Sequence, residues 1–310
     1  MQLFIYPALT DQLTALLRRQ LPASVTPIFR SDLPDDAQPD ALRTADALFG
    51  NPPVSWLTGL TDKLAFWQLD SAGFDKYRGV QTRAQVANMG DYFAWPCAET
   101  MIAGIMAFYR RIPELAVLQS RSEWVGAPMR QRTDLLRHKR VIILGTGTIG
   151  RAVRQMLTGF DCRVTMLART DAQADIHSVD ELRAALPETD LVINCLPGTA
   201  TGFVSAEVIG AMPARCLYAN VGRGSTTDEA ALIDALQAGR LAGAVLDVTD
   251  AEPLPADSPL WALPNVLLTQ HTGGGQPDED QGKVEQLLRN LHRLERGEPV
   301  ENEVGLGRGY

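Results

Sequence analysis

The segment VIILGTGTIG, residues 141–150, joins a short apolar run to three glycines spaced as G-x-G-x-x-G. Residues 141–144 are apolar without interruption, which is typical of a buried strand. The sequence that follows keeps Ile149, Val153 and Leu157 on one face of a helix. The segment therefore predicts a buried strand, a tight turn and an amphipathic helix in immediate succession.

The three glycines fit a turn that binds the phosphates of a nucleotide. Gly145 permits the tight turn, Gly147 lets the backbone approach a pyrophosphate, and Gly150 lets the helix pack close to the strand. The helix N-terminus adds amide donors and partial positive charge. The spacing alone is weak evidence, but its context favours a dinucleotide site over the alternative, a tight strand-to-helix turn without a ligand.

The second strand, RVTMLART at residues 163–170, indicates which dinucleotide is preferred. An NAD site usually has an aspartate or glutamate about 20 residues after the glycines, whereas a 2′-phosphate needs positive charge there. This chain has Arg169 and Thr170 at that strand end, and a guanidinium with a hydroxyl suits a phosphate. We therefore expect NADP(H) to be preferred; the alternative is that Arg169 is a surface residue and NAD(H) also binds.

The rest of this half of the chain alternates strands with helices, as a parallel sheet with crossover helices requires. Thr226 and Glu229 have the spacing of a capping box for the last of these helices. The expected strands are 141–145, 163–168, 190–196, 215–221, 243–248 and 266–270, and the expected helices are 149–157, 180–186 and 228–238.

The first hundred residues show a similar rhythm with shorter elements, which suggests a second open α/β sheet. The expected strands are 3–6, 26–29, 45–50 and 65–73, and the expected helices are 11–21 and 55–63.

Two long helices define the domain organisation. Residues 97–109 are apolar on nearly every face, which predicts a helix covered on all sides, between domains or between subunits. A charged amphipathic helix at 278–295 has no later strand to cross to, so we expect it to pack on the first domain. The sequence thus predicts an α/β fold of two parallel-sheet domains, a first domain of residues 1–96 plus 276–310 and a dinucleotide-binding domain of residues 97–275.

Composition narrows the class of protein. The 310 residues are 45% hydrophobic, enough for sizeable cores, and the formal net charge of -8 gives no field that would gather nucleic acid or an anionic membrane. No run reaches the roughly 18 apolar residues of a membrane span. The 4 cysteines show no C-x-x-C pair and no zinc-ligand spacing, so we expect free thiols, no metal and a cytoplasmic location.

Three further segments place polar side chains at the ends of expected strands. They are YANVGRGS at 218–225, LDVTDAEP at 246–253 and TQHTGGG at 269–275. In an open α/β sheet, ligands bind beyond the carboxyl ends of the strands. Side chains at these ends are therefore expected to converge on the cofactor.

Arg223, Glu252 and His271 suit redox chemistry on a small acid. The guanidinium of Arg223 can bind a substrate carboxylate, and His271 can give a proton to the carbonyl oxygen as hydride reaches the carbon. Glu252 can hold the ring and stabilise imidazolium. Each residue alone has an ordinary alternative, as a turn residue, a loop charge or a core histidine; their order behind a nucleotide fold favours catalysis.

These motifs closely resemble those of the D-isomer-specific 2-hydroxyacid dehydrogenase family, and more loosely those of its glyoxylate and hydroxypyruvate reductase branch. The resemblance rests on GTGTIG, NCLPGTATG, NVGRGS, LDVTDAEPLP and the histidine after the last strand, and it covers nearly the whole chain. It implies a flavodoxin-like and a Rossmann-like domain with the active site in a cleft between them. It also implies a homodimer built around the helix after Cys97.

The resemblance assigns roles residue by residue. It makes Arg223, Glu252 and His271 the catalytic residues. It also implies that a loop, here SAGFD, binds the substrate carboxylate through backbone amides, which gives Ala72 and Gly73.

Other positions follow from the same resemblance. Asn51 is expected to face the substrate, as is Trp95. The family commonly has proline just before the histidine, where this chain has Gln270. The implied cofactor contacts are Thr148 and Ile149 at the phosphates, Leu196 and Pro197 beside the adenosine half, and Val221 and Asp247 near the nicotinamide.

The sequence thus predicts an NADPH-dependent reductase of small 2-oxo acids such as glyoxylate or hydroxypyruvate. Two alternatives stay open. One is a dinucleotide-sensing binding protein of the same fold, similar to a corepressor, and the other is an NAD-linked 2-hydroxyacid dehydrogenase.

Overall fold

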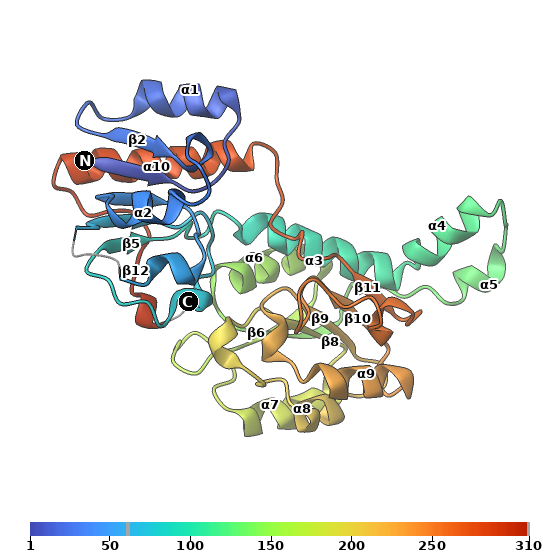
Figure 1. Cartoon of the computed structure of the whole chain (residues 1–310). Coiled ribbons are helices and arrows are strands. Elements are labelled where there is room, and N and C mark those ends of the chain that lie inside the picture. The colour runs from blue at the N-terminus through green and yellow to red at the C-terminus, as the bar shows by residue number, and fades with distance from the viewer. Residues whose placement is uncertain (60–62, 309–310) are drawn as a thin grey trace. The chain divides into compact units, whose positions relative to one another are not determined.

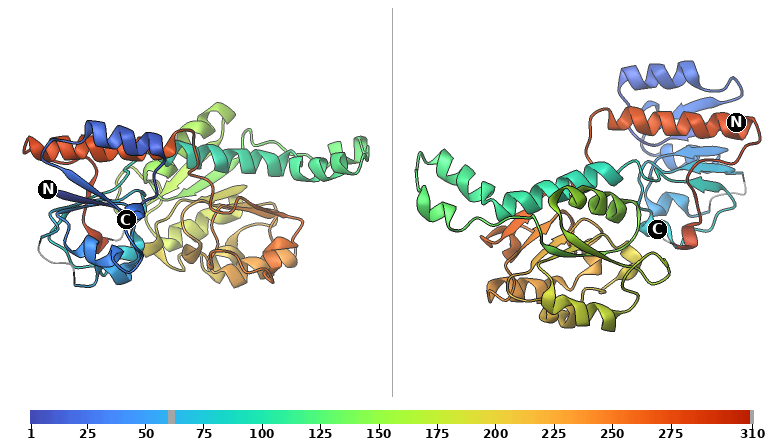
Figure 2. Two further views of the ribbon diagram at one scale, coloured as in Figure 1. Left: turned by 45° about the horizontal axis from the view of Figure 1, so that its top comes forward. Right: turned by 180° about the vertical axis from the view of Figure 1, so that it is seen from behind.

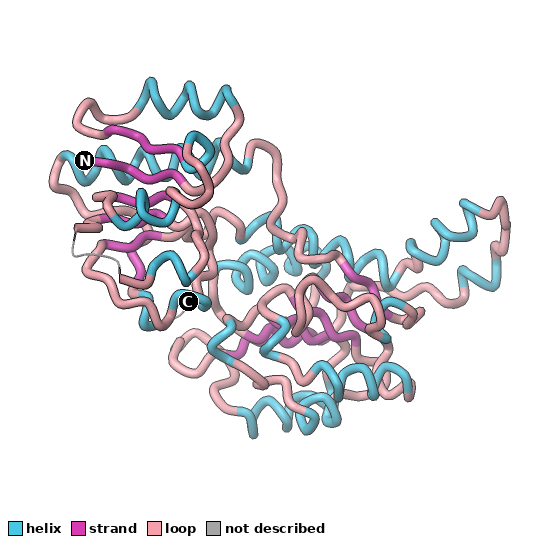
Figure 3. The backbone as a smooth tube through the Cα atoms, viewed as in Figure 1, coloured by secondary structure: helices cyan, strands magenta, loops and turns pink. Residues whose placement is uncertain are grey.

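The computed structural model describes residues 1–59 and 63–308, which form two compact α/β units (Figure 1). Unit 1 comprises Met1–Tyr92 and Gln276–Tyr310, and unit 2 comprises Phe93–Gly275. Each unit contains one 6-stranded sheet with helices beside it (Figure 3). The predicted fold class, α/β with two parallel-sheet domains, is confirmed.

The sheet of unit 2 is parallel throughout, with the order β11-β10-β9-β8-β6-β7. Its strands are β6 (Arg140–Leu144), β7 (Arg163–Leu167), β8 (Leu191–Asn194), β9 (Leu217–Asn220), β10 (Gly243–Leu246) and β11 (Val266–Leu268). Its longer helices are α3 (Ala94–Tyr109), α4 (Ile112–Ser120), α6 (Thr148–Leu157), α7 (Val179–Ala185) and α9 (Glu229–Gln237), with the short helices α5 (Ala127–Arg130) and α8 (Ala206–Ala211). The strand order reverses between β6 and β8, where such sheets bind ligands.

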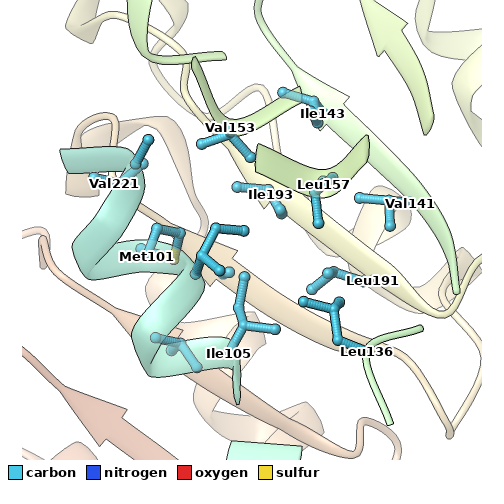
Figure 4. Close-up of a cluster of buried hydrophobic side chains, with 14 of the residues drawn as sticks. Met101, Ile105, Leu136, Val141, Ile143, Val153, Leu157, Leu191, Ile193 and Val221 are labelled. Carbon is cyan, nitrogen blue, oxygen red and sulfur yellow. The ribbon is translucent and has the colours of Figure 1, made fainter. Parts of the chain in front are cut away.

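Alternate side chains of β6 divide the core of unit 2 into two layers. Val141 and Ile143 pack with α3 and α6 on one face (Figure 4). Ile142 and Leu144 pack with α7, α8 and α9 on the other. Both layers are apolar because successive side chains of a strand point to opposite faces, and this explains why residues 141–144 have no polar member.

The sheet of unit 1 has the order β12-β5-β4-β3-β1-β2 and is parallel except at β12. Its strands are β1 (Gln2–Ile5), β2 (Thr26–Phe29), β3 (Ala47–Phe49), β4 (Phe66–Gln68), β5 (Gln85–Ala87) and β12 (Glu303–Val304), and its helices are α1 (Asp11–Gln20), α2 (Gln38–Arg43) and α10 (Glu279–Glu295). Numbering the strands of each sheet along the chain gives both sheets the same order, 2-1-3-4-5-6.

Helix α10 packs on unit 1, as its amphipathic pattern predicts. Its side chains Val284, Leu287 and Leu291 are buried in the same cluster as Leu3 of β1 and Leu17 of α1. Apolar contact with elements from the start of the chain therefore fixes the place of this helix. The expectation that no strand follows it is wrong, because β12 lies after α10 and joins the same sheet.

Two sequence predictions of local structure are wrong. A helix is expected at 55–63, but the structure has a short 3₁₀ helix, Val54–Leu57, and a turn at Gly59; residues 60–62 lie outside the described chain. The capping box of Thr226 and Glu229 does not form, because the N-cap of α9 is Asp228, whose carboxylate accepts from the Ala231 amide at 3.0 Å.

Helix α3 begins at Ala94, three residues before the predicted start, and is buried along only part of its surface. Its apolar face lies against α6 and the sheet, whereas Trp95 and Met106 are exposed. Beyond it, α4 and α5 project from the rest of unit 2 (Figure 2). Trp124, between them, is 96% exposed.

Candidate active site

The glycine-rich turn connects β6 directly to α6, and each glycine meets a separate steric demand. Gly145 has a φ of +104°, which L-residues rarely adopt. A Cβ on Gly150 would lie 2.3 Å from the Gly145 carbonyl oxygen, so only glycine lets α6 approach the strand this closely. A Cβ on Gly147 would meet nothing within 4 Å, which leaves open space above the backbone there.

The N-terminus of α6 is suited to an anion. Gly147 is the N-cap residue, and within the described chain no side chain caps this helix. The first amides of a helix have no partner inside the helix and carry partial positive charge. The predicted phosphate contacts at Thr148 and Ile149 therefore fall to backbone amides, because the Ile149 side chain packs against the core.

The end of β7 combines the predicted Arg169 and Thr170, both exposed, with three residues that the sequence analysis did not identify. Arg151 of α6 pairs with Asp171 at 2.7 Å. His177 Nδ1 lies 2.9 Å from the Ala168 carbonyl oxygen and so fixes the turn.

Asp171 corrects the sequence analysis, which places no carboxylate at this strand end. The Gln173 amide donates to Asp171 and lowers the pKa of its carboxyl, with help from Arg151. Since the carboxylate is ion-paired, its charge does not stand alone beside a bound nucleotide. The position of Asp171, two residues after Arg169, was the signal available in the sequence.

Two buried asparagines shape the turns after β8 and β9. Asn194 Oδ1 accepts from the Leu196 amide at 3.0 Å, and Asn220 Oδ1 accepts from the Gly222 amide at 3.0 Å. Asn220 Nδ2 also donates to the Arg223 carbonyl oxygen at 3.2 Å. These asparagines orient the predicted residues Leu196 and Arg223. Each is the single polar residue at the end of an apolar strand, and the sequence analysis did not use this signal.

Several predicted cofactor residues contribute backbone rather than side chain to this region. The side chains of Leu196 and Val221 are buried in the two cores of unit 2. Pro197 follows in the turn after β8. A Cβ on Gly222 would lie 2.3 Å from the Leu196 carbonyl oxygen, so these two turns are in close contact.

His271 and Glu252 form a direct pair. Nδ1 of His271 lies 2.6 Å from Oε2 of Glu252, and both side chains are partly exposed. Glu252 also accepts from the Thr249 amide at 3.1 Å. Because Nδ1 faces the carboxylate, Nε2 is the ring atom left for a substrate. Arg223 follows β9, and the pair follows the neighbouring strands β10 and β11.

Asp247 holds the loop that carries His271. Its carboxylate accepts from the Thr269 hydroxyl at 2.6 Å and from the amides of Thr272 and Gly273 at 3.1 Å each. The carbonyl oxygen of Asp247 accepts from the His271 amide at 2.6 Å. Asp247, predicted at the nicotinamide, is therefore also the anchor of the histidine loop.

The residue before the histidine, Gln270, has a backbone conformation that proline cannot adopt. Gln270 and His271 have φ values of +55° each, in the left-handed region. Proline holds φ near −65° and cannot adopt this conformation. Two consecutive left-handed residues without glycine are strained, and the bonds of Asp247 maintain them.

A cavity of about 450 Å³ opens beside the His271–Glu252 pair. Its wall is mainly apolar and lies entirely within unit 2; it includes Leu246, Pro253, Leu254, Trp261 and Leu268. Trp261 is 47% exposed. The hydrogen-bonded pair thus lies at the border of an apolar space.

The predicted substrate residues of unit 1 lie together after β3 and β4. Asn51 Nδ2 donates to the Ser71 hydroxyl at 2.8 Å, which in turn donates to the Gly73 carbonyl oxygen at 2.7 Å. Asn88 Nδ2 donates to the Ala72 carbonyl oxygen at 2.7 Å. Ser71 and Asn88 were not identified from the sequence. Trp95 belongs to unit 2 and is 46% exposed on α3.

Residues 1–59 and 63–308 contain no group of three His, Cys, Asp or Glu side chains that could hold a metal ion. None of the helices in these ranges has the length and apolar character to cross a membrane. None of the 4 cysteines forms a disulfide.

The turn at β6, the helix N-terminus and the histidine–carboxylate pair define a class, the NAD(P)-dependent oxidoreductases. Residues 102–273 match the family model described as D-isomer specific 2-hydroxyacid dehydrogenase, NAD binding domain. The chain belongs to this family.

Individual relatives agree with this assignment. The chain is 34% identical over 219 residues to glyoxylate/hydroxypyruvate reductase A of Salmonella heidelberg (strain SL476), covering 68% of each chain. A D-isomer specific 2-hydroxyacid dehydrogenase of Xanthobacter autotrophicus Py2, in complex with NADPH and MES, superposes with a TM-score of 0.79 at 27% identity, covering 99% of both chains. An NADPH-dependent glyoxylate/hydroxypyruvate reductase of Sinorhizobium meliloti, at 20% identity and a TM-score of 0.82, covers 100% of this chain and 99% of its own and shares the fold.

Proposed function

We propose that this oxidoreductase reduces small 2-oxo acids, glyoxylate or hydroxypyruvate, to 2-hydroxy acids with NADPH. The His271–Glu252 pair carries the proposal, since a partly exposed imidazole 2.6 Å from a carboxylate can supply a proton to a carbonyl oxygen. The relatives described as glyoxylate/hydroxypyruvate reductases support the substrate class.

The reduced nicotinamide, when bound, supplies the hydride. On the protein side, His271 acts as the general acid through Nε2, and Glu252 holds the ring and stabilises the imidazolium form. Arg223, placed by Asn220 at the end of β9, binds the substrate carboxylate or carbonyl oxygen through its guanidinium. Within unit 1, the backbone amides of Ala72 and Gly73 are the groups that we propose for binding a carboxylate.

The preference for NADPH rests on the end of β7. Arg169 and Thr170 are exposed there, and Arg151 holds Asp171 in an ion pair. The structural relatives in complex with NADPH and NADP support the same preference. The relevant comparison is between initial rates with NADPH and NADH.

We also propose a homodimer and a cytoplasmic location. The exposed apolar side chains of α4 and its surroundings support the dimer; they are Ile112, Leu115, Val117, Trp124, Val125 and Leu135. We propose the dimer contact at these side chains rather than on α3, because the apolar face of α3 is already covered within unit 2. Four cysteines without a disulfide suit a reducing compartment.

The test is oxidation of NADPH and NADH by the purified protein with glyoxylate, hydroxypyruvate, pyruvate and phenylpyruvate. Turnover with glyoxylate or hydroxypyruvate, faster with NADPH, is the expected result. Faster turnover with NADH would instead indicate an NAD-linked dehydrogenase. Tight cofactor binding without turnover of any acid would contradict the proposal and favour a dinucleotide sensor.

A further inference from the structure

The loop at residues 71–73 has all three of its carbonyl oxygens bonded to the interior of unit 1. The Met89 amide donates to the Ser71 carbonyl oxygen at 3.1 Å. Asn88 Nδ2 donates to the Ala72 carbonyl oxygen at 2.7 Å. The Ser71 hydroxyl donates to the Gly73 carbonyl oxygen at 2.7 Å. The donors come from the end of β5 and from the loop itself.

The amides of the same loop make no such bonds. Over residues 1–59 and 63–308, the backbone N–H groups of Ala72, Gly73 and Phe74 donate to no acceptor. Ala72 and Gly73 are half-buried, so a small ligand can reach their backbone, whereas Phe74 beside them is 1% exposed. Three successive amides without partners are unusual in a protein interior, where nearly all buried N–H groups are paired.

The two observations have one cause, because a peptide group is planar and trans. Its carbonyl oxygen and the N–H of the next residue therefore point in opposite directions. Bonding the Ala72 oxygen inward turns the Gly73 N–H outward, and bonding the Gly73 oxygen inward does the same for Phe74. Asn88 and Ser71 thus each determine the direction of one amide.

Both side chains are themselves held. Asn88 is 8% exposed, and its Oδ1 accepts from the Gly90 amide at 2.9 Å, which fixes the amide group with Nδ2 toward the loop. The Ser71 hydroxyl accepts from Asn51 Nδ2 at 2.8 Å, which directs its proton to Gly73. Asn51 is thereby engaged in supporting Ser71.

We infer that Asn88 and Ser71, supported by Asn51, are positioning residues that preorganise a carboxylate site made of the amides of Ala72, Gly73 and Phe74. Fixed donors stabilise an anion without reorganisation when it binds. The ligand class is a small carboxylate, and the inference rests on the proposed function only in taking that carboxylate to belong to the 2-oxo acid. Its consequence is that Asn88 and Ser71 determine the KM of the acid while the proton chemistry of unit 2 determines kcat.

The decisive variant is Asn88→Asp. It keeps the size of the side chain and the oxygen that accepts from the Gly90 amide. It also replaces Nδ2 with an oxygen that repels the Ala72 carbonyl oxygen, so the peptide group between Ala72 and Gly73 is no longer held in one direction. Ser71→Ala removes the hydroxyl, and Ser71→Thr restores it. Gln38→Glu is the matched control, since Gln38 is 6% exposed in unit 1 and its Nε2 donates to the Leu33 carbonyl oxygen at 3.2 Å.

Steady-state kinetics and oxalate binding to the NADPH-loaded protein test the inference together. We expect Asn88→Asp and Ser71→Ala to raise KM for the oxo acid and the Kd of oxalate roughly ten- to a hundredfold, the usual loss for a charged hydrogen bond. We expect kcat and NADPH affinity to change by less than about threefold, and we expect Ser71→Thr to restore KM. Gln38→Glu should leave KM and Kd unchanged.

The outcomes separate this inference from the proposed function. If the parent protein reduces 2-oxo acids but Asn88→Asp keeps the parent KM and oxalate Kd, the positioning role is wrong and the reductase assignment stands. If the parent turns over no acid, the reductase assignment is wrong; weaker oxalate binding to Asn88→Asp would still support the carboxylate site, and equal or absent binding would overturn it.

Discussion

The two units share one strand order but differ at the first helix of each sheet. In unit 2, α6 begins at a glycine, and within the described chain no side chain caps it. In unit 1, α1 is capped by Thr10, whose hydroxyl accepts from the Leu13 amide at 3.3 Å. The topology provides the same helix N-terminus twice, and the N-cap residue decides whether its amides remain available to a phosphate.

The turn before each helix strengthens this contrast. After β1, the carbonyl oxygen of Tyr6 accepts from Arg30 Nε at 2.8 Å, and the Tyr6 ring lies edge-on to Trp56 with centroids 5.6 Å apart. Side chains therefore fill the region that glycines leave open after β6. Unit 1 instead presents backbone amides after β4, in the loop at 71–73. The proposed phosphate site of unit 2 and the proposed carboxylate site of unit 1 therefore lie at different positions in two sheets of the same strand order.

The largest expected effect tests whether the proton chemistry belongs to unit 2 alone. His271→Gln should lower kcat by roughly 10²- to 10⁴-fold, because it removes the general acid. NADPH affinity, measured by fluorescence titration, should stay within about threefold of the parent value. A kcat within tenfold of the parent value would mean that another group delivers the proton.

The second prediction concerns a substitution that gives α6 a side-chain N-cap like that of α1. In Gly147→Asp the new carboxylate has space, since a Cβ there meets nothing within 4 Å. It should cap the helix and repel the pyrophosphate, raising the Kd for NADPH by about a hundredfold or more, while Tm stays equal or rises.

Thr10→Ala is the reciprocal control for Gly147→Asp. It should cost about 1 kcal/mol of unfolding free energy in urea titration and leave the Kd for NADPH unchanged. Unaltered NADPH binding in Gly147→Asp would refute the assignment of α6 as the phosphate site.

A third, smaller effect concerns the 2′-phosphate. Arg169→Ala should weaken NADPH binding roughly ten- to a hundredfold, since a charge-assisted bond to phosphate is lost, and should leave NADH binding unchanged. Isothermal titration with both cofactors measures the ratio. An equal loss for NADPH and NADH would show that Arg169 supports the fold rather than the phosphate.

The smallest expected effect is on stability and concerns Asp70, which precedes the loop at residues 71–73 of unit 1. Desolvation raises the pKa of Asp70 above its ordinary value of 3.8, against the opposing influence of Lys283. The native state therefore binds this proton more tightly than the unfolded state, and stability is lost as pH rises from 3.8 through the raised pKa. Asp70→Asn should be more stable than the parent at pH 7, by on the order of 1 kcal/mol, and equally stable below pH 3.8.

Asp46, in the same unit, has a pKa shift of the opposite direction and therefore the opposite effect on stability. A hydrogen bond from the Gln2 amide lowers the pKa of Asp46. The stabilising contribution of Asp46 is therefore present above the ordinary value of 3.8 and is lost as pH falls. Asp46→Asn should therefore destabilise the protein at neutral pH. Urea unfolding across the pH range measures both variants, and the same sign for both would contradict the assignment.

Features that depend on local chemistry could be predicted from the residues alone. The apolar run at 141–144 is typical of a strand buried on both faces. The three glycines match three local demands of one turn: a positive φ at Gly145, open space at Gly147 and a close backbone contact at Gly150. Arg223, Glu252 and His271 were identifiable because each follows an apolar strand, and parallel strands bring their carboxyl ends to one edge.

The folded chain, and no local pattern, establishes which residues meet across long sequence separations. Asn88 reaches the Ala72 carbonyl oxygen, Asp247 holds the loop of His271, and Arg151 neutralises Asp171. No local pattern encodes these pairs, because hydrogen bonds and ion pairs between distant segments depend on the sheet that aligns them. The sequence therefore identifies the chemical groups of the site, and the fold determines the direction in which each group acts.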